Sequence, residues 1–181
     1  MPIRLAPLEP PYAESTAATL AEMMPPGVPP LLLFRTIAHN PRVLGKIRAS
    51  NLLDRGSIDR RQREIVILRT TARCDCEYEW GVHVSFFAAK VALGEGEVAA
   101  TVYGKADDAV WSESERALIR LVDELHDTSR VSDALWAELR RHFRDDQLVE
   151  LVVLAGFYHT ISFVVNGLGV PLEPGAPRFP S

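Results

Sequence analysis

The sequence predicts an all-α protein with about seven or eight helices, and three observations support that prediction. Between the two ends of the chain, apolar residues recur at intervals of three and four, which is the period of an amphipathic helix. No segment shows the alternation of apolar and polar residues that marks a half-buried strand. Signals for helix starts are frequent, and the strongest is the capping box Ser112-x-x-Glu115 ahead of an apolar run.

Proline and glycine set the boundaries of the expected domain. They crowd both ends of the chain, so residues 1–30 are interpreted as a Pro-rich arm with a short helix and residues 170–181 as a Pro-rich tail. The helical domain then covers residues 31–169. At 181 residues with 47% apolar content, the chain has enough material for one buried core.

The helices of the first half follow from the apolar spacing and from their caps. A short helix is expected around Leu20, Met23 and Met24, and the next ones at residues 31–38, 43–53 and 59–73. The helix at residues 31–38 stops near Asn40-Pro41, because proline cannot continue a helix. Ser57 and Asp59 offer N-caps for the helix that ends near residue 73.

The second half follows the same rules. A helix over residues 77–93 is expected to be closed by Gly94 as its C′ residue, and a short helix follows over residues 95–103. Three further helices are expected to start at Ser112, at Ser132 or Asp133, and at Asp145 or Asp146. Polar residues interrupt the apolar stretch Leu148–Leu168 of the last one, which indicates a buried helix and not a membrane span.

Charge and cysteine content exclude several partners and compartments. The chain has 20 Lys and Arg against 24 Asp and Glu, so it offers no basic field to a nucleic acid. The N-terminus lacks the uninterrupted apolar core of a signal peptide. Cys74 and Cys76 are too close together for an unstrained disulfide. We therefore expect a cytoplasmic protein with no membrane partner.

Residues 64–94 carry the side chains best suited to chemistry, namely acids, two thiols and a histidine at the junction of two helices. Cys76, Glu79 and His83 stand at i, i+3 and i+7, so they share one face of the second helix. Glu64 precedes an apolar run on the first helix. If Glu64 is buried, desolvation raises its pKa toward the range useful for proton transfer, with His83 as its partner.

The pattern Glu64-x11-Cys76-x2-Glu79-x3-His83 resembles that of the carboxymuconolactone decarboxylase superfamily, which also contains the thiol peroxidase alkylhydroperoxidase D. The resemblance covers about residues 40–167. It implies an all-helical, alkylhydroperoxidase D-like domain that forms a homo-oligomer, a trimer or hexamer, with a small-molecule substrate bound close to a subunit contact. The catalytic residues that it implies are Glu64, Cys76, Glu79 and His83.

The resemblance leaves two kinds of chemistry open. Peroxidases of this superfamily carry cysteines at the positions of Cys76 and Glu79, where one thiolate attacks the peroxide and the second thiol resolves the product. Here a glutamate replaces the second cysteine. Cys74 is not an equivalent partner, because residues i and i+2 of a helix point to different sides. The decarboxylase branch lacks the cysteine pair and uses acid–base chemistry.

The favoured hypothesis is a decarboxylase-type lyase without a cofactor, acting on a small carboxylated lactone. In it Glu64, Glu79 and His83 transfer protons and Cys76 lines the pocket. Two arginines at the end of the helix that carries the first glutamate are expected to attract the anionic substrate: Arg69 and Arg73. The alternatives are a peroxiredoxin-like thiol hydroperoxidase that uses Cys76, and a ligand-binding helical oligomer without catalysis.

Each of these side chains also has a structural interpretation. Glu64 can pair with an arginine of segment 60–63 on a solvated helix face. Glu79 can be a surface residue that only contacts the histidine one turn later. His83 can be a core histidine whose hydrogen bonds serve packing alone.

Two further residues are expected to be structural. Cys74 is interpreted as a small buried residue, and His159 as a core residue or a subunit contact. No metal site is predicted, because Cys74, Cys76 and His83 lack the spacing of zinc ligands and no second pair follows.

Overall fold

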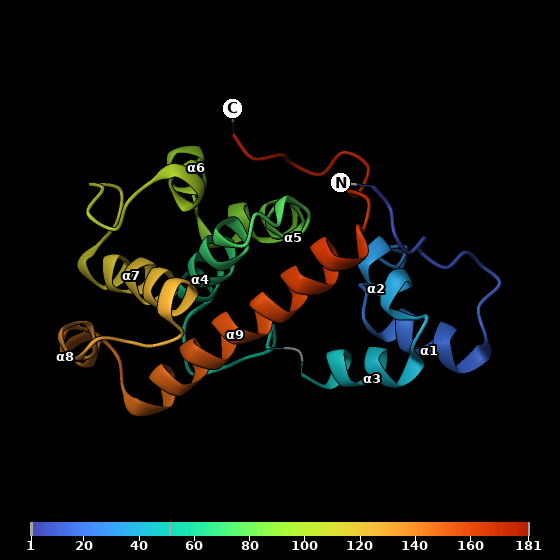
Figure 1. The fold of residues 1–181 in the computed structure, drawn as a ribbon, viewed down its shortest axis with the longest axis horizontal. Helices are drawn as coiled ribbons and strands as arrows, with labels where there is room; N and C mark the ends of the chain where they lie inside the picture. The colour runs from blue at the N-terminus through green and yellow to red at the C-terminus, as the bar shows by residue number, and fades with distance from the viewer. Residues whose placement is uncertain (1, 51, 181) are drawn as a thin grey trace.

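The computed structural model describes residues 2–50 and 52–180, and within them it has nine α-helices and no strand (Figure 1). The all-α prediction is confirmed. The nine helices in this part of the chain exceed the predicted total of seven or eight, and they correspond one to one to the segments that the apolar spacing and the caps indicated. Residues 1, 51 and 181, which belong to the predicted arm, third helix and tail, lie outside the described residues.

Three short helices come first: α1 (Glu14–Glu22), α2 (Leu32–Ile37) and α3 (Pro41–Ala49). The side chain of Asn40 accepts the amide of Val43 and so caps α3, whose first residue is a proline. The prediction that this helix reaches residue 53 is wrong. It ends at Ala49, because the following leucines, Leu52 and Leu53, pack separately on the main core.

The central helix is α4 (Arg60–Arg73), which is covered on several sides. Its residues 65–68 are fully buried. Its neighbours are α5 (Glu77–His83), α6 (Glu95–Tyr103), α7 (Glu113–Thr128) and α9 (Asp145–Leu168), while α8 (Asp133–His142) packs on α7 (Figure 1). A helix that is covered on several sides buries consecutive residues, which explains why the run 65–68 contains no polar residue.

A tight turn joins α4 to α5. Asp75 adopts the left-handed conformation, with φ of 51°. The amide of Cys76 donates to the carbonyl of Thr71 at 2.8 Å, and the amide of Asp75 donates to that of Ala72 at 3.0 Å. This is the Schellman pattern of a helix C-terminus. The turn separates the two cysteines, because Cys76 enters the core while Cys74 stays half-buried at the end of α4.

The predicted continuous helix over residues 77–93 is wrong in its second half. The α-helix ends at His83 and continues as a π-helical turn, Val84–Ala88, and a 3₁₀ turn, Ala89–Val91. Ala92, with φ of 55°, ends the segment, so the predicted closing residue Gly94 instead precedes α6 as its N-cap. Such π-helical turns occur often at functional sites.

Both proline-rich ends lie against the helical body. The carbonyl of Leu168 accepts the amides of Arg4 and Leu5. The ring of Phe179 meets that of Trp80 edge-on, with centroids 5.3 Å apart. The tail thus covers the outer side of α5.

The last helix, α9, is long and apolar enough by length and composition to cross a membrane, although such helices also form the cores of other proteins. In the most apolar window of α9, 44% of the residues are buried inside the protein. One face packs on α4 and α5. The opposite face is exposed and carries Val149, Val153 and Phe163.

Candidate functional site

Three of the four predicted site residues meet where α5 packs against α4. The Nδ1 atom of His83 lies 2.7 Å from Oε2 of Glu64, and its Nε2 atom lies 3.5 Å from Oε1 of Glu79. The helical spacing of i, i+4 places Glu79 one turn before His83, and helix packing places Glu64 on the other side of the ring. The imidazole therefore lies between two carboxylates.

Glu64 is completely buried and has two partners. Its Oε1 atom accepts a hydrogen bond from Nε of Arg63 at 2.9 Å, and its Oε2 atom faces His83. A buried carboxylate needs both charge compensation and hydrogen bonds, and here it has both. Glu64 does pair with a neighbouring arginine, as the structural interpretation supposed, but not on a solvated face.

The environment of His83 favours its charged form. Burial alone would lower the pKa of the imidazole, but hydrogen bonds and charges from Glu64 and Glu79 outweigh burial and raise it to about 9. At neutral pH the ring is therefore an imidazolium. It donates one proton toward each carboxylate.

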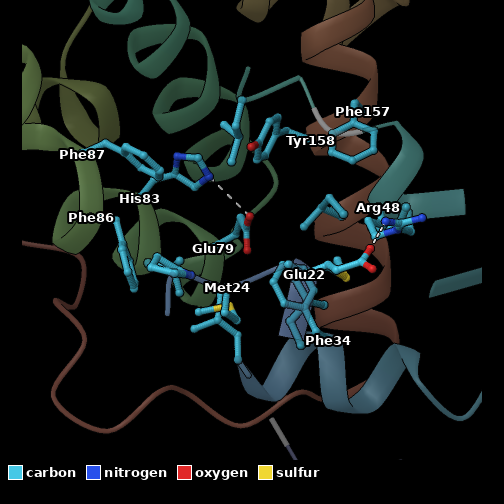
Figure 2. A pocket seen from close by; sticks show the side chains of 18 of the residues that line it. Glu22, Met24, Phe34, Arg48, Glu79, His83, Phe86, Phe87, Phe157 and Tyr158 are labelled. Atoms are coloured by element: carbon cyan, nitrogen blue, oxygen red, sulfur yellow. Dashed lines mark hydrogen bonds and ion pairs between the residues drawn. The ribbon is translucent and has the colours of Figure 1, made fainter. Parts of the chain in front are cut away.

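Glu79 differs from Glu64 in one respect that bears on function. Its side chain is buried, and its Oε2 atom has no hydrogen-bond partner in the part of the chain that the structure describes. A buried unpartnered carboxylate oxygen is costly, and such atoms are rare unless a ligand or water completes them. Glu79 lines a cavity, as Figure 2 shows, and so the free oxygen marks a place for a bound molecule.

The cavity has a volume of about 250 Å³, slightly below the range of sites for drug-sized ligands. Its wall comes from α1, α2 and α3, from α5 with the π-helical turn, and from α9. The wall is mainly apolar and aromatic; its members include Met23, Met24, Leu33, Phe34, Val82, Phe86, Phe87, Phe157, Tyr158 and Ile161. Glu79 and His83 form a polar patch on this wall (Figure 2).

Two cations also line the cavity, and neither was predicted. Arg48 is paired with Glu22. Lys90 lies over the ring of Phe87, 5.6 Å from its centroid, and has no carboxylate within ion-pair distance among residues 2–50 and 52–180. Lys90 is thus the cation best placed to meet an anionic group of a ligand.

The predicted role of Arg69 and Arg73 in attracting substrate is wrong. Arg69 is buried and makes two hydrogen bonds to Asp123, at 2.8 and 2.9 Å. Arg73 pairs with Asp127 and Asp123. Both arginines project toward α7, because they lie on the side of α4 that faces away from the cavity. They stabilise the α4–α7 contact.

The expectation that Cys76 lines the pocket is also wrong. Cys76 is 0% exposed and belongs to a second core cluster with Tyr78, Val82 and Ile161. Burial raises the pKa of its thiol to about 12, and the charge of Glu79 adds to the shift. The sequence spacing is right, but the turn before α5 directs this side chain into the core. The catalytic role of Cys76 stays a prediction.

Tyr158 is the main residue that sequence reasoning missed. Its ring meets that of His83 edge-on, with centroids 5.1 Å apart, and it lines the cavity from α9. Burial raises the pKa of the hydroxyl well above its usual value, and the charges of Glu79 and Glu64 act in the same direction. The hydroxyl therefore stays protonated. No local pattern in the sequence connects α9 to His83, 75 positions earlier.

The chain combines an all-helical fold with a buried carboxylate–imidazole–carboxylate group beside an apolar cavity. Residues 42–124 match the carboxymuconolactone decarboxylase family. This match and the shared fold support the resemblance to the carboxymuconolactone decarboxylase/alkylhydroperoxidase D-like superfamily that the pattern from Glu64 to His83 predicted. None of the curated proteins compared with the chain is similar enough to match it.

Solved structures share the fold at low sequence identity. An uncharacterized peroxidase-related protein from Silicibacter sp. TM1040 gives a TM-score of 0.80 at 15% identity, over 99% of this chain and 96% of that one. An alkylhydroperoxidase AhpD core protein from Ralstonia eutropha JMP134 gives a TM-score of 0.76 at 18% identity, over 96% of this chain and 94% of that one. The debrominase Bmp8, as a Cys-to-Ala variant in complex with 2,3,4-tribromopyrrole, gives a TM-score of 0.77 at 14% identity, over 96% of this chain and 94% of that one.

Proposed function

We propose that the protein is an acid–base enzyme of the decarboxylase type, in which Glu79 and His83 move a proton on a small ring-shaped carboxylated substrate. The observation that carries this proposal is the buried Oε2 atom of Glu79, which is unpartnered within the described residues and belongs to a side chain that lines the cavity (Figure 2). Its other oxygen lies 3.5 Å from His83 Nε2, which can supply or take up a proton.

The cavity restricts the substrate. Its size suits a compact molecule, and its aromatic wall suits a planar or partly unsaturated ring. Lys90 can bind one carboxylate of such a ring. The debrominase Bmp8, which has the same fold, forms a complex with the small ring 2,3,4-tribromopyrrole. A lactone acid meets all of these requirements.

Decarboxylation in this cavity has a simple course. The bond between the ring and its carboxylate breaks, carbon dioxide leaves, and the electron pair passes into the ring as a dienolate. The protonated hydroxyl of Tyr158 can donate a hydrogen bond to the developing oxyanion. The proton that ends on carbon comes from His83, directly or through Glu79. Glu64 holds the imidazole in place and stabilises its charge.

The thiol alternative has weaker support. Burial raises the pKa of the Cys76 thiol to about 12, so very little of the reactive thiolate is present at neutral pH. Cys76 is also fully buried and is absent from the cavity wall among the residues described. The peroxidase-related proteins share the fold with this chain at 15 to 18% identity, and that likeness extends to the fold alone.

Turnover assays decide between these chemistries. The wild-type protein is tested with γ-carboxymuconolactone, related lactone acids and organic hydroperoxides, with release of carbon dioxide and consumption of peroxide as readouts. We expect decarboxylation that survives in Cys76→Ser. Peroxide consumption that disappears in Cys76→Ser, with no lactone acid turned over, would overturn the proposal.

A further inference from the structure

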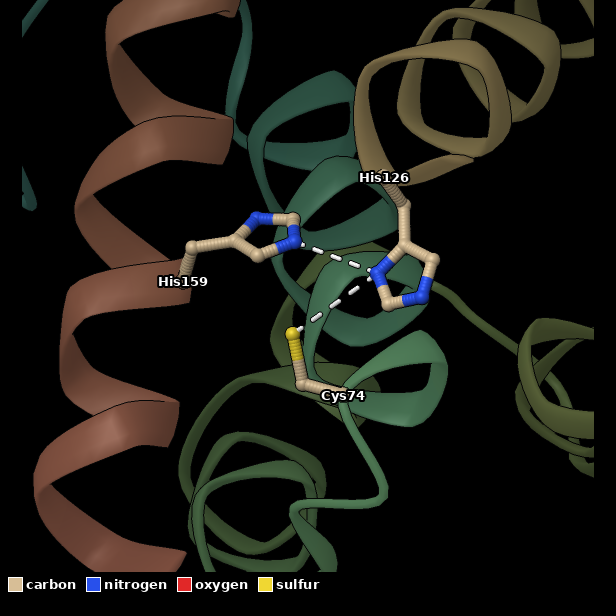
Figure 3. A group of neighbouring side chains, drawn as sticks. All are labelled: Cys74, His126 and His159. Atoms are coloured by element: carbon tan, nitrogen blue, oxygen red, sulfur yellow. Dashed lines mark hydrogen bonds between the residues drawn. The ribbon is translucent and has the colours of Figure 1, made fainter. Parts of the chain in front are cut away.

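A second cluster of reactive side chains lies away from the cavity, where three helices meet. Cys74 comes from the end of α4, His126 from the last turn of α7, and His159 from the middle of α9 (Figure 3). The Nδ1 atom of His126 lies 3.1 Å from Nε2 of His159 and 4.0 Å from Sγ of Cys74. All three ligand atoms lie within 4.8 Å of one another.

These separations are close to those of a zinc centre. Tetrahedral Zn²⁺ with ordinary bond lengths places two nitrogen ligands about 3.3 Å apart and a nitrogen and a sulfur about 3.6 Å apart. The observed 3.1 Å and 4.0 Å differ from these values by a few tenths of an ångström. The third pair, Sγ of Cys74 and Nε2 of His159, lies within 4.8 Å, so binding an ion requires it to shorten by about 1 Å at most. Two imidazoles and one thiolate are also a ligand set that Zn²⁺ favours.

The surroundings of the cluster prepare the ligands for a metal. His159 Nδ1 lies 3.2 Å from the carbonyl of Ala155, which fixes the proton on Nδ1 and leaves the lone pair of Nε2 pointing at the cluster. The side-chain amide of Asn166 donates to the carbonyl of Cys74 at 2.8 Å and so holds the backbone that carries the thiol. Outer partners of this kind orient the ligands of metal sites.

The charges near the cluster do not oppose a cation. The charge of Arg73 acts on both Cys74 and His126. Arg73 is, however, paired with Asp127 and Asp123, so its charge is largely balanced. The ligands are half-buried, which protects a metal–thiolate bond yet leaves a route for an ion to enter.

We propose that Cys74, His126 and His159 bind one Zn²⁺ ion, with a water molecule as the fourth ligand. The site is separate from the proposed catalytic site, because Tyr158 faces the cavity while the next residue, His159, faces α7. The ion joins the ends of α4 and α7 to α9. It therefore stabilises the fold whether or not the protein has the function proposed above.

The test measures metal binding by protein that has first been freed of metal with a chelator. Zn²⁺ is titrated in competition with an indicator dye, and Co²⁺ is titrated as a spectroscopic substitute. We expect one ion per chain, a thiolate-to-cobalt absorption band, and the strong visible bands of a tetrahedral site. The melting temperature should rise when Zn²⁺ is added.

Variants locate the ion. Cys74→Ser, His126→Gln and His159→Gln should each weaken Zn²⁺ binding by roughly 100-fold or more. Matched controls that keep full binding are Cys76→Ala, the other cysteine, and His142→Gln, a half-buried histidine on α8. Circular dichroism verifies that each variant is folded.

Three outcomes would overturn the proposal. They are no binding to the wild type at micromolar Zn²⁺, binding that the three ligand variants leave unchanged, and a Co²⁺ spectrum without a thiolate band. The spectrum uses the wild type only, so the test remains decisive if a variant does not fold. None of these readouts involves turnover, so failure of the catalytic proposal leaves them unaffected.

Discussion

His83 carries a positive charge at neutral pH because two carboxylates face it from different helices. Glu64 contributes the shorter contact, at 2.7 Å, and Glu79 the longer one, at 3.5 Å. Arg63 balances the charge of Glu64, and Glu79 is the carboxylate that lines the cavity. The two glutamates therefore have different tasks. One positions the imidazole, and the other meets the ligand.

Glu79→Gln tests the second task. The amide cannot accept or deliver a proton at the cavity, so we expect turnover of the lactone acid to fall by roughly 100-fold or more, with little change in folding. Steady-state kinetics and circular dichroism measure the two effects. Glu95→Gln, on the exposed first turn of α6, is the control and should keep full activity. Equal losses in both variants would contradict the role of Glu79.

The raised pKa of His83 also predicts how stability depends on pH. The folded protein holds the proton more tightly than the unfolded chain, since the pKa rises from 6.5 to about 9 on folding. This contribution is complete below about pH 6.5 and is lost as the pH rises through 9, in total on the order of 3 kcal/mol. Urea unfolding of the wild type should show this loss, and His83→Gln should not. If the free energy of unfolding depends on pH in the same way in the wild type and in His83→Gln, the raised pKa of His83 is refuted.

At the scale of elements, local signals predicted the helix starts better than the ends. The caps at Asp59, Ser112 and Ser132 are present as expected, because each depends on a side chain and an amide within three residues. The π-helical turn after His83 and the left-handed Ala92 have no such signal. The π-helical turn carries Phe86 and Phe87, which line the cavity together with residues from distant parts of the chain.

The site was predictable to the same extent. The spacing of Glu79 and His83 was readable from the helix period, and Glu64 was indicated by its place before an apolar run and then by the family resemblance. Tyr158 and the cluster of Cys74 with His126 and His159 come together only through packing between residues that lie 33 to 85 positions apart along the chain. Single-sequence patterns contain no information on such contacts.

A substitution at Gly81, on the helix that carries the site, tests how the C-terminal tail packs on that helix. A Cβ atom there would lie 2.3 Å from the carbonyl oxygen of Pro177, so Gly81→Ala should push the C-terminal tail off α5 and cost about 1–3 kcal/mol. Faster proteolysis of the tail would reveal its release. Gly45→Ala in α3, where a Cβ meets nothing within 4 Å, should instead stabilise the protein by about 0.5–1 kcal/mol. An equally protected tail in Gly81→Ala would contradict the contact.

At the scale of the whole molecule, the outer face of α9 has no partner among residues 2–50 and 52–180. Its exposed residues form one stripe along the helix: Val149, Val152, Val153, Gly156, Thr160 and Phe163. Exposed apolar stripes of this kind are typical of subunit contacts, and the superfamily resemblance implies a homo-oligomer.

We therefore predict that a second copy of the chain covers this stripe. Light scattering should find an assembly larger than the monomer, and Val153→Glu should shift it toward the monomer. Glu95→Gln, away from the stripe, should leave the mass unchanged. A wild type that is monomeric at tens of micromolar would contradict this prediction.

The central claim is that His83 is an imidazolium held between Glu64 and Glu79 at the cavity. NMR titration of the isotope-labelled imidazole groups tests it most directly, with the His83 signal assigned by its absence in His83→Gln. We predict a midpoint near pH 9 for His83 in the wild type and a lower midpoint in Glu64→Gln. A wild-type midpoint at or below the ordinary value of 6.5 would contradict the account, because the imidazole would then be neutral and unable to donate the proton.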